Sequence, residues 1–219
     1  LLPAIVVASA GTTATGAVDP LPALADLCAH EGLWLHVDAA YGGFFLLTER
    51  GRAALAGIER ADSLTLDPHK GLFLPYGTGC LLVRDLDTLR AAHRIGASYL
   101  PPAETDPDCW DFADFGPELS RDARGLRVWL PLKMHGAATF RAQLDEKLDL
   151  AALAAERLAA LPELEMVAPP QLSLLAFRVR AADPAASERA TRRLATRVNA
   201  RQRVLLTGVH VGGSYLLRG

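Results

Sequence analysis

The chain has 219 residues, of which 50% are hydrophobic and 22% are charged, and its formal net charge is −2. This composition is typical of a globular protein that buries a core, and it argues against an intrinsically disordered chain. The small net charge and the lack of a Lys/Arg run argue against a nucleic-acid or acidic-membrane binder.

The first ninety residues alternate between strand-like and helix-like segments. Asp19-Pro20 is a typical helix start, with Asp19 as the cap and proline in the first turn, and Gly32 is a typical stop. Strands are predicted at 5–9, 33–38, 63–67 and 80–84, and helices at 21–30 and 49–58. Short apolar strands separated by amphipathic helices predict an α/β fold with a mostly parallel sheet covered on both faces.

The opening apolar run ends in Ala8-Ser9-Ala10, small residues that also occur at signal-peptide cleavage sites. The run lacks a basic region before it, and the sequence does not begin with Met, so a buried strand is the preferred interpretation. No apolar run approaches the ~20 residues that a membrane span requires.

The cysteines are odd in number and widely spaced, which predicts free thiols in a reducing compartment such as the cytoplasm. They are Cys28, Cys80 and Cys109. No Cys or His pair has the short spacing of a zinc site, so no metal site is predicted.

The alternation of strand-like and helix-like segments stops after residue 93. Residues 94–121 are rich in proline and predict a long connection, of the kind that serves as a lid or linker. Helices are then predicted at 125–135, 137–161 and 186–201, and strands at 172–179, 204–206 and 214–217. We therefore divide the chain into a sheet domain (1–93), a mobile loop and linker (94–125), and a helical connection with a smaller α+β domain (126–219).

Candidate chemical groups follow three successive predicted strands: Thr12-Thr13, Asp38-Ala39-Ala40 and His69-Lys70. Asp38 and Lys70 are separated by about the length of one βαβ unit, which places both at the same edge of a parallel sheet. Pyridoxal phosphate needs a lysine for its imine and a carboxylate facing its pyridine nitrogen. An Asp–Lys pair taken alone is more often a surface salt bridge.

The local sequence favours the cofactor. Residues 35–43 (LHVDAAYGG) and 61–70 (ADSLTLDPHK) closely resemble the group II pyridoxal-phosphate-dependent decarboxylases, which include aromatic amino-acid, histidine and glutamate decarboxylases. Residues 10–13 and 126–129 resemble further segments of that family in the same order. The resemblance covers nearly the whole chain and implies fold type I, the PLP-dependent transferase-like fold, with 1–93 as the second half of the cofactor-binding large domain.

The resemblance also implies roles for individual residues. Lys70 forms the imine with the cofactor, and Asp38 pairs with the pyridine nitrogen. Ala40 packs against one face of the ring, and Thr13 lies close to the cofactor.

The same resemblance implies that Asp67 and His69, which precede Lys70, flank the cofactor. His69 is expected to bind it and to take part in catalysis, although a capping role in a helix or turn is the alternative. Asp67 stands where the animal enzymes often have Asn. A carboxylate there would repel the phosphate unless Asp67 points elsewhere or is protonated. Gly71 is a further departure, since relatives often have Trp after the lysine.

Tyr99 corresponds to a family tyrosine on a mobile loop, which supplies a proton to the substrate after carbon dioxide leaves. The alternative is a tyrosine whose ring anchors the loop. Tyr76 and Ser120 are expected to line the substrate pocket. The Gly77-Thr78-Gly79 segment resembles a phosphate-binding loop, but a turn into the next strand is the preferred interpretation.

Together these features predict a carboxy-lyase that converts an L-amino acid, which the sequence does not name, to its amine. The alternatives are an aminotransferase or a C–S or C–C lyase on the same fold, or an inactive remnant. The family works as a homodimer with active sites at the interface. Residues that stack on the ring and hold the phosphate are missing, so we expect an incomplete chain that is inactive in isolation.

Overall fold

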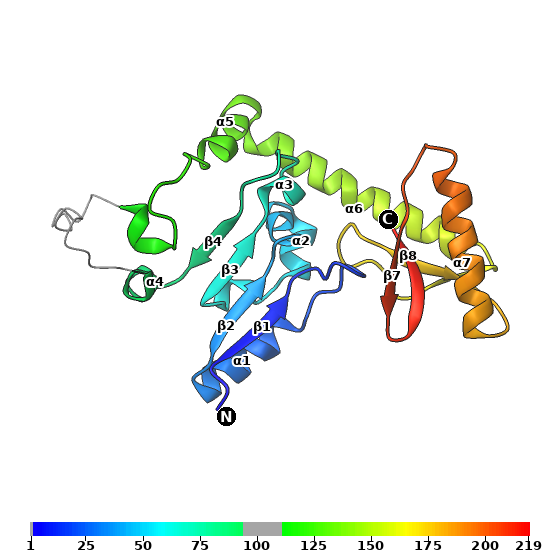
Figure 1. Ribbon diagram of the computed structural model, residues 1–219, viewed down its shortest axis with the longest axis horizontal. Helices are drawn as coiled ribbons and strands as arrows, with labels where there is room; N and C mark the ends of the chain where they lie inside the picture. Colours follow the sequence, from blue (N-terminus) through cyan, green and yellow to red (C-terminus); the bar gives the residue numbers. More distant parts are fainter. Residues whose placement is uncertain (1, 94–110) are drawn as a thin grey trace.

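A computed structural model describes residues 2–93 and 111–219 (Figure 1). The chain forms two four-stranded sheets, and the long helix α6 (Ala137–Ala159) runs from the first to the second (Figure 1). Tyr99 and Cys109 lie outside the described residues. The described helices include none that is long and apolar enough to cross a membrane.

The first sheet has the order β1-β2-β3-β4, with β1, β2 and β3 parallel and β4 antiparallel. The mostly parallel α/β sheet predicted from the sequence is therefore confirmed, while α3 and α4 were not predicted. Its elements are β1 (Ile5–Ser9), α1 (Leu21–Glu31), β2 (Trp34–Asp38), η1 (Gly43–Leu47), α2 (Glu49–Ala54), η2 (Ile58–Arg60), β3 (Ser63–Leu66), α3 (Pro68–Gly71), β4 (Cys80–Val83) and α4 (Leu86–His93).

Helix α1 covers one face of this sheet, where Leu21 packs into the same buried core as Leu35 of β2. The helix stops at Gly32, whose φ of 66° lies in the left-handed region that glycine adopts at little cost. Asp19 does not cap the helix as predicted. Its carboxylate instead accepts a hydrogen bond from the Ser9 N–H at 2.7 Å, which ties the helix approach to β1.

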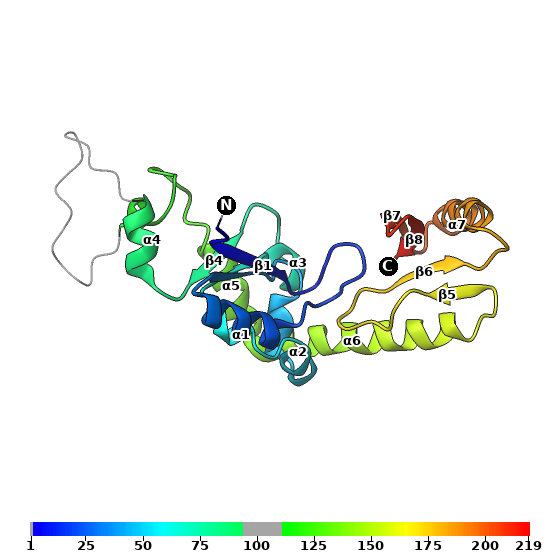
Figure 2. The same cartoon turned by 90° about the horizontal axis from the view of Figure 1, so that it is seen from below.

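The opposite face of the first sheet is open in the described part of the chain. Figure 2 shows α1 on one side of β1 and β2 and no helix over them on the other. Ile5 and Val7 are 53% and 62% exposed, although they belong to an apolar strand. The predicted cover on both faces is therefore absent from the described residues. An apolar sequence predicts that a strand is buried, but it does not predict which segment covers the strand.

The short helices η1 and α2 meet at Thr48, which is fully buried. Its hydroxyl donates to the Phe45 carbonyl at 2.8 Å and accepts from the Gly51 N–H at 2.9 Å, so it caps α2. A Cβ on Gly51 would lie 1.9 Å from the Phe45 oxygen, so only glycine allows this close junction. The junction matters for the site because η1 supports α3.

Replacing Thr48 with alanine is expected to lower the free energy of unfolding by about 1–2 kcal/mol, because the buried Gly51 N–H loses its acceptor. Urea denaturation of the full-length protein measures this change. Thr48→Ser keeps the hydroxyl and serves as the control. An equal loss in both variants would contradict the capping role.

The second sheet is antiparallel throughout, with the order β5-β6-β8-β7. The two long helices predicted at 125–161 are confirmed, and β5 was not predicted. Besides α6, the elements of this part of the chain are η3 (Phe112–Phe115), α5 (Leu126–His135), β5 (Leu164–Met166), β6 (Ala176–Val179), α7 (Pro184–Asn199), β7 (Thr207–Val211) and β8 (Ser214–Arg218).

The strand predicted at 204–206 is wrong, since β7 begins only at Thr207. The Asn199 side chain accepts a hydrogen bond from the Leu206 N–H and donates to its carbonyl, at 2.8 and 2.9 Å. These bonds occupy the backbone groups that a neighbouring strand would need. Beyond them, Gly212 and Gly213 have φ values of 55° and 77° and form the two-residue turn of the β7–β8 hairpin.

Candidate cofactor site

The site is built where the parallel strands β2 and β3 end. Asp38 is the last residue of β2 and lies beside Thr65 of β3 in the parallel register. The Ala39 N–H donates to the Thr65 carbonyl, and the Asp67 N–H donates to the Ala40 carbonyl, both at 3.1 Å. The segments that follow the two strands therefore lie side by side at the edge where open α/β sheets bind ligands.

Lys70 is held by α3, a single turn that begins directly after β3. Pro68 is buried in the first turn, where a missing N–H costs nothing, and the Lys70 N–H donates to the Asp67 carbonyl at 2.9 Å. A Cβ on Gly71 would lie 2.6 Å from Phe44 Cβ, so glycine lets α3 pack closely on η1. This contact gives a physical reason for Gly71, the departure noted in the sequence.

Of the two carboxylates considered at this edge of the sheet, Asp67 contacts the Lys70 amine and Asp38 does not. Lys70 Nζ lies 2.7 Å from Asp67 Oδ2, and the two side chains are 43% and 19% exposed. His69 Nε2 lies 3.9 Å from the same oxygen. Asp38 forms no ion pair with any described residue, and its Oδ1 accepts the Ala40 N–H at 3.1 Å. One carboxylate thus holds the lysine, while the other is left available to a different cation.

His69 and Tyr76 form the adjoining wall. Their ring centroids are 4.7 Å apart with an interplanar angle of 37°, and Tyr76 is otherwise exposed. Among the described residues, two buried side-chain atoms lack a hydrogen-bond partner, His69 Nδ1 and Thr78 Oγ1. Because buried polar atoms are normally paired, these two are available to a partner outside the described residues.

The remaining candidate residues are less closely tied to Lys70. Thr13 is exposed, and its carbonyl accepts a hydrogen bond from the Arg218 guanidinium, which links the first sheet to β8. Ser120 is exposed in the loop before α5, and no described hydrogen bond connects it to Lys70 or Asp38. The prediction for Tyr99 falls outside the described residues.

Comparison with known families decides between the interpretations of this edge. Residues 1–180 match the pyridoxal-dependent decarboxylase conserved domain. The chain belongs to the pyridoxal-dependent decarboxylase family. The cofactor and the fold type I architecture expected from the sequence are thereby confirmed.

Individual relatives of this decarboxylase-family chain agree with the assignment. It is 46% identical over 177 residues to an aromatic-L-amino-acid decarboxylase of Bacillus atrophaeus, covering 80% of this chain and 37% of that protein. It is similar to the crystal structure of Oryza sativa TDC with PLP and tryptamine, with a TM-score of 0.92, 32% identity and coverage of 100% and 46%. A 4-hydroxyphenylacetaldehyde synthase of Rhodiola rosea gives a TM-score of 0.86 at 28% identity, with coverage of 100% and 44%. The chain spans less than half the length of these relatives.

The residues present fit pyridoxal phosphate. The family's cofactor needs a primary amine and a carboxylate, and Lys70 in α3 and Asp38 at the end of β2 could supply these. The unpartnered His69 Nδ1 and Thr78 Oγ1 add polar groups at the same end of the sheet. Thr78 was missed as a candidate because a phosphate-binding role for Gly77-Thr78-Gly79 was set aside in favour of a turn; a threonine between two turn glycines was the available signal.

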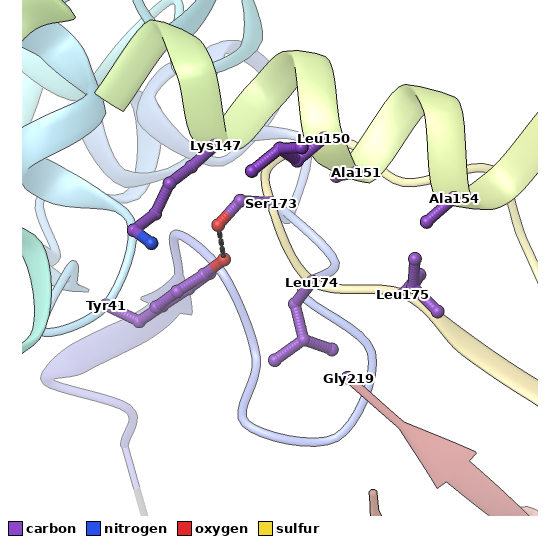
Figure 3. Close-up of a pocket in the computed structure, with 9 residues that line it drawn as sticks. All are labelled: Tyr41, Lys147, Leu150, Ala151, Ala154, Ser173, Leu174, Leu175 and Gly219. Atoms are coloured by element: carbon purple, nitrogen blue, oxygen red, sulfur yellow. Dashed lines mark hydrogen bonds between the residues drawn. The ribbon is translucent and has the colours of Figure 1, made fainter. Parts of the chain in front are cut away.

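A pocket of about 410 Å³ lies beside this site, between α6 and residues 173–175 (Figure 3). Tyr41 borders it and forms a hydrogen bond with Ser173 Oγ at 2.7 Å. Burial raises the pKa of Tyr41, and the hydrogen bond to Ser173 opposes that rise. Lys70 and Asp38 are not among the lining residues, so this pocket is distinct from the cofactor site.

Proposed function

We propose that the full-length protein is a carboxy-lyase that decarboxylates an L-amino acid, with an aromatic side chain as the first class to test, to its amine. The observation that carries the proposal is the Asp67–Ala40 backbone hydrogen bond, which joins the segment of Asp38 to the segment of Lys70. Support for an aromatic substrate comes from the names of the relatives, aromatic-L-amino-acid decarboxylase among them.

In this proposal Lys70 attaches the cofactor covalently, and Asp38 faces the pyridine nitrogen, where an opposite charge stabilises the protonated ring. Ala40 packs against one ring face, and Thr13 and His69 complete the cofactor contacts from this chain. When bound, the cofactor would accept the electron pair left on the substrate's Cα as carbon dioxide departs. His69, stacked on Tyr76, is positioned to hold or pass a proton at the rim of the site.

The remaining predicted roles concern the substrate. Tyr76 lines the substrate pocket beside His69, and Ser120 reaches it from the loop before α5. Tyr99, which lies outside the described residues, is proposed to deliver a proton to Cα. These roles depend on parts of the whole protein beyond the described residues.

The test is to express the full-length gene and to supply L-tryptophan, L-tyrosine and L-phenylalanine, with L-aspartate and L-glutamate as non-aromatic comparisons. Stoichiometric carbon dioxide and amine from an aromatic substrate are the expected products. An aldehyde in place of the amine would indicate chemistry like that named for the Rhodiola rosea relative. A keto acid without carbon dioxide would favour an aminotransferase, and failure to bind the cofactor would favour an inactive remnant.

We also propose that the whole protein is a cytoplasmic homodimer in which both subunits contribute to each active site. Cys28 and Cys80 are free thiols, which supports a reducing compartment. The orphaned polar atoms and the open sheet face support the view that further protein completes the site. Sedimentation of the cofactor-loaded full-length protein measures the assembly.

A further inference from the structure

The side chain of Asp67 is used in an unusual way. Asp67 occupies the N-cap position of α3, where aspartate commonly accepts a hydrogen bond from the helix backbone, yet its side chain forms no capping bond. Its Oδ2 instead contacts Lys70 Nζ at 2.7 Å, and the carboxylate is largely buried, at 19% exposed. The N-terminus of α3 therefore lacks a side-chain cap, and the carboxylate contacts the Lys70 amine instead.

We propose that Asp67 is the counter-ion that holds Lys70 in the cofactor-free protein, and that the incoming aldehyde must take the amine away from it. Asp67 is then a positioning residue for Lys70 and not a phosphate ligand. This inference rests on the proposed function, in which Lys70 attaches the cofactor.

Asp67 opposes the reaction by which Lys70 is joined to the aldehyde. Capture joins Lys70 Nζ to the aldehyde carbon through a C=N double bond. The ammonium first gives up one proton to solvent, and its two remaining hydrogens leave with the aldehyde oxygen as water. An ammonium paired with a carboxylate at 2.7 Å must lose that partner before its nitrogen is free to add to the carbon.

The ion pair with Lys70 also explains how a carboxylate at position 67 is compatible with a nearby phosphate. A carboxylate directed at a phosphate would repel it, whereas here the carboxylate points at Lys70 and its charge is compensated. Once Lys70 is captured, Asp67 needs a new partner. His69 Nε2 is already 3.9 Å away, and its other ring nitrogen has no partner among the described residues. His69 is therefore the side chain that replaces Lys70.

The test measures cofactor capture in the cofactor-free, full-length protein. Wild type and Asp67→Asn are mixed separately with pyridoxal 5′-phosphate and with pyridoxal, which has the aldehyde but no phosphate. The capture rate is followed by absorbance, and attachment at Lys70 is located by borohydride reduction and mass spectrometry. The control, Asp149→Asn, removes a carboxylate from the Arg50–Asp149 ion pair of 2.6 Å, which joins α2 to α6.

Asp67→Asn is expected to speed capture of both aldehydes by a similar factor, about two- to fivefold, which is the scale of a partly exposed ion pair. Asp149→Asn is expected to leave both rates unchanged. Asp67→Ala, which also lacks the carboxylate, repeats the measurement independently. If circular dichroism shows that both variants misfold, the rate at which wild-type protein captures pyridoxal is measured at increasing salt concentration. Salt screens ion pairs and is therefore expected to raise that rate.

Faster capture of the phosphorylated aldehyde alone would overturn the inference and place Asp67 at the phosphate. Unchanged or slower capture of both aldehydes would also overturn it. A wild-type protein that attaches neither aldehyde at Lys70 would defeat the proposed function itself, so the two failures are distinguishable.

Discussion

Replacing Lys70 with alanine in the full-length protein is expected to abolish amine release and to leave no borohydride-reducible adduct at this position. The residue supplies the only nitrogen through which the proposed cofactor attachment occurs. Loss of a covalent catalytic group typically lowers turnover by about 10⁴-fold or more. Product assays and mass spectrometry of the reduced protein measure the two effects.

Lys70→Arg is the matched control for this prediction. Arginine keeps the positive charge and retains an ion-pair donor for Asp67, but its guanidinium stays protonated and does not attack carbonyls. The variant is therefore expected to be as inactive as Lys70→Ala while unfolding at nearly the wild-type denaturant concentration. Substantial turnover by either variant would rule out Lys70 as the attachment residue.

Replacing Asp38 with asparagine is expected to lower kcat by about 10²–10³-fold, the usual cost of removing one preorganised charge from a reacting centre. Asparagine is almost the same size and can still accept the Ala40 N–H, which Asp38 Oδ1 accepts at 3.1 Å. The local backbone should therefore be retained, and the cofactor should still attach at Lys70. Steady-state kinetics and borohydride trapping on the same sample separate the two properties.

Asp62→Asn is the control for Asp38. The Asp62 carboxylate accepts the Leu35 N–H at 2.7 Å near the start of β2, away from the strand ends that carry the site. Its substitution also exchanges a carboxylate for an amide that can accept the same bond, so kcat should be unchanged. An equal fall in kcat for both variants would mean that Asp38 acts through the stability of the sheet and not at the ring.

Much of the fold could be predicted because its signals are local. The β-branched run at residues 5–9 and the Ala/Leu-rich stretch after residue 137 form the expected strand and helix. Gly32 ends α1 for the expected reason, its left-handed φ. The βαβ spacing also placed Asp38 and Lys70 on neighbouring strand ends, since the carboxyl ends of parallel strands share an edge.

Errors occurred where a side chain had a choice of partners. Asp19 was expected to cap α1 but bonds to Ser9, and Asn199 takes the backbone groups of Leu206 that a strand would have used. The partners lie far enough along the chain that no local pattern predicts them. The Gly212-Gly213 pair was a local hairpin signal that went unused.

The sequence by itself determined the secondary-structure alternation, the family motifs and the chemical groups available at the strand ends, because these depend on neighbouring residues. Only the tertiary structure decided that Asp67 pairs with Lys70, and that among the described residues Asp38 has no ion-pair partner and one sheet face is open. The physical reason is that a charge or an apolar face is satisfied by whichever group the fold brings near, and several candidates compete for each position.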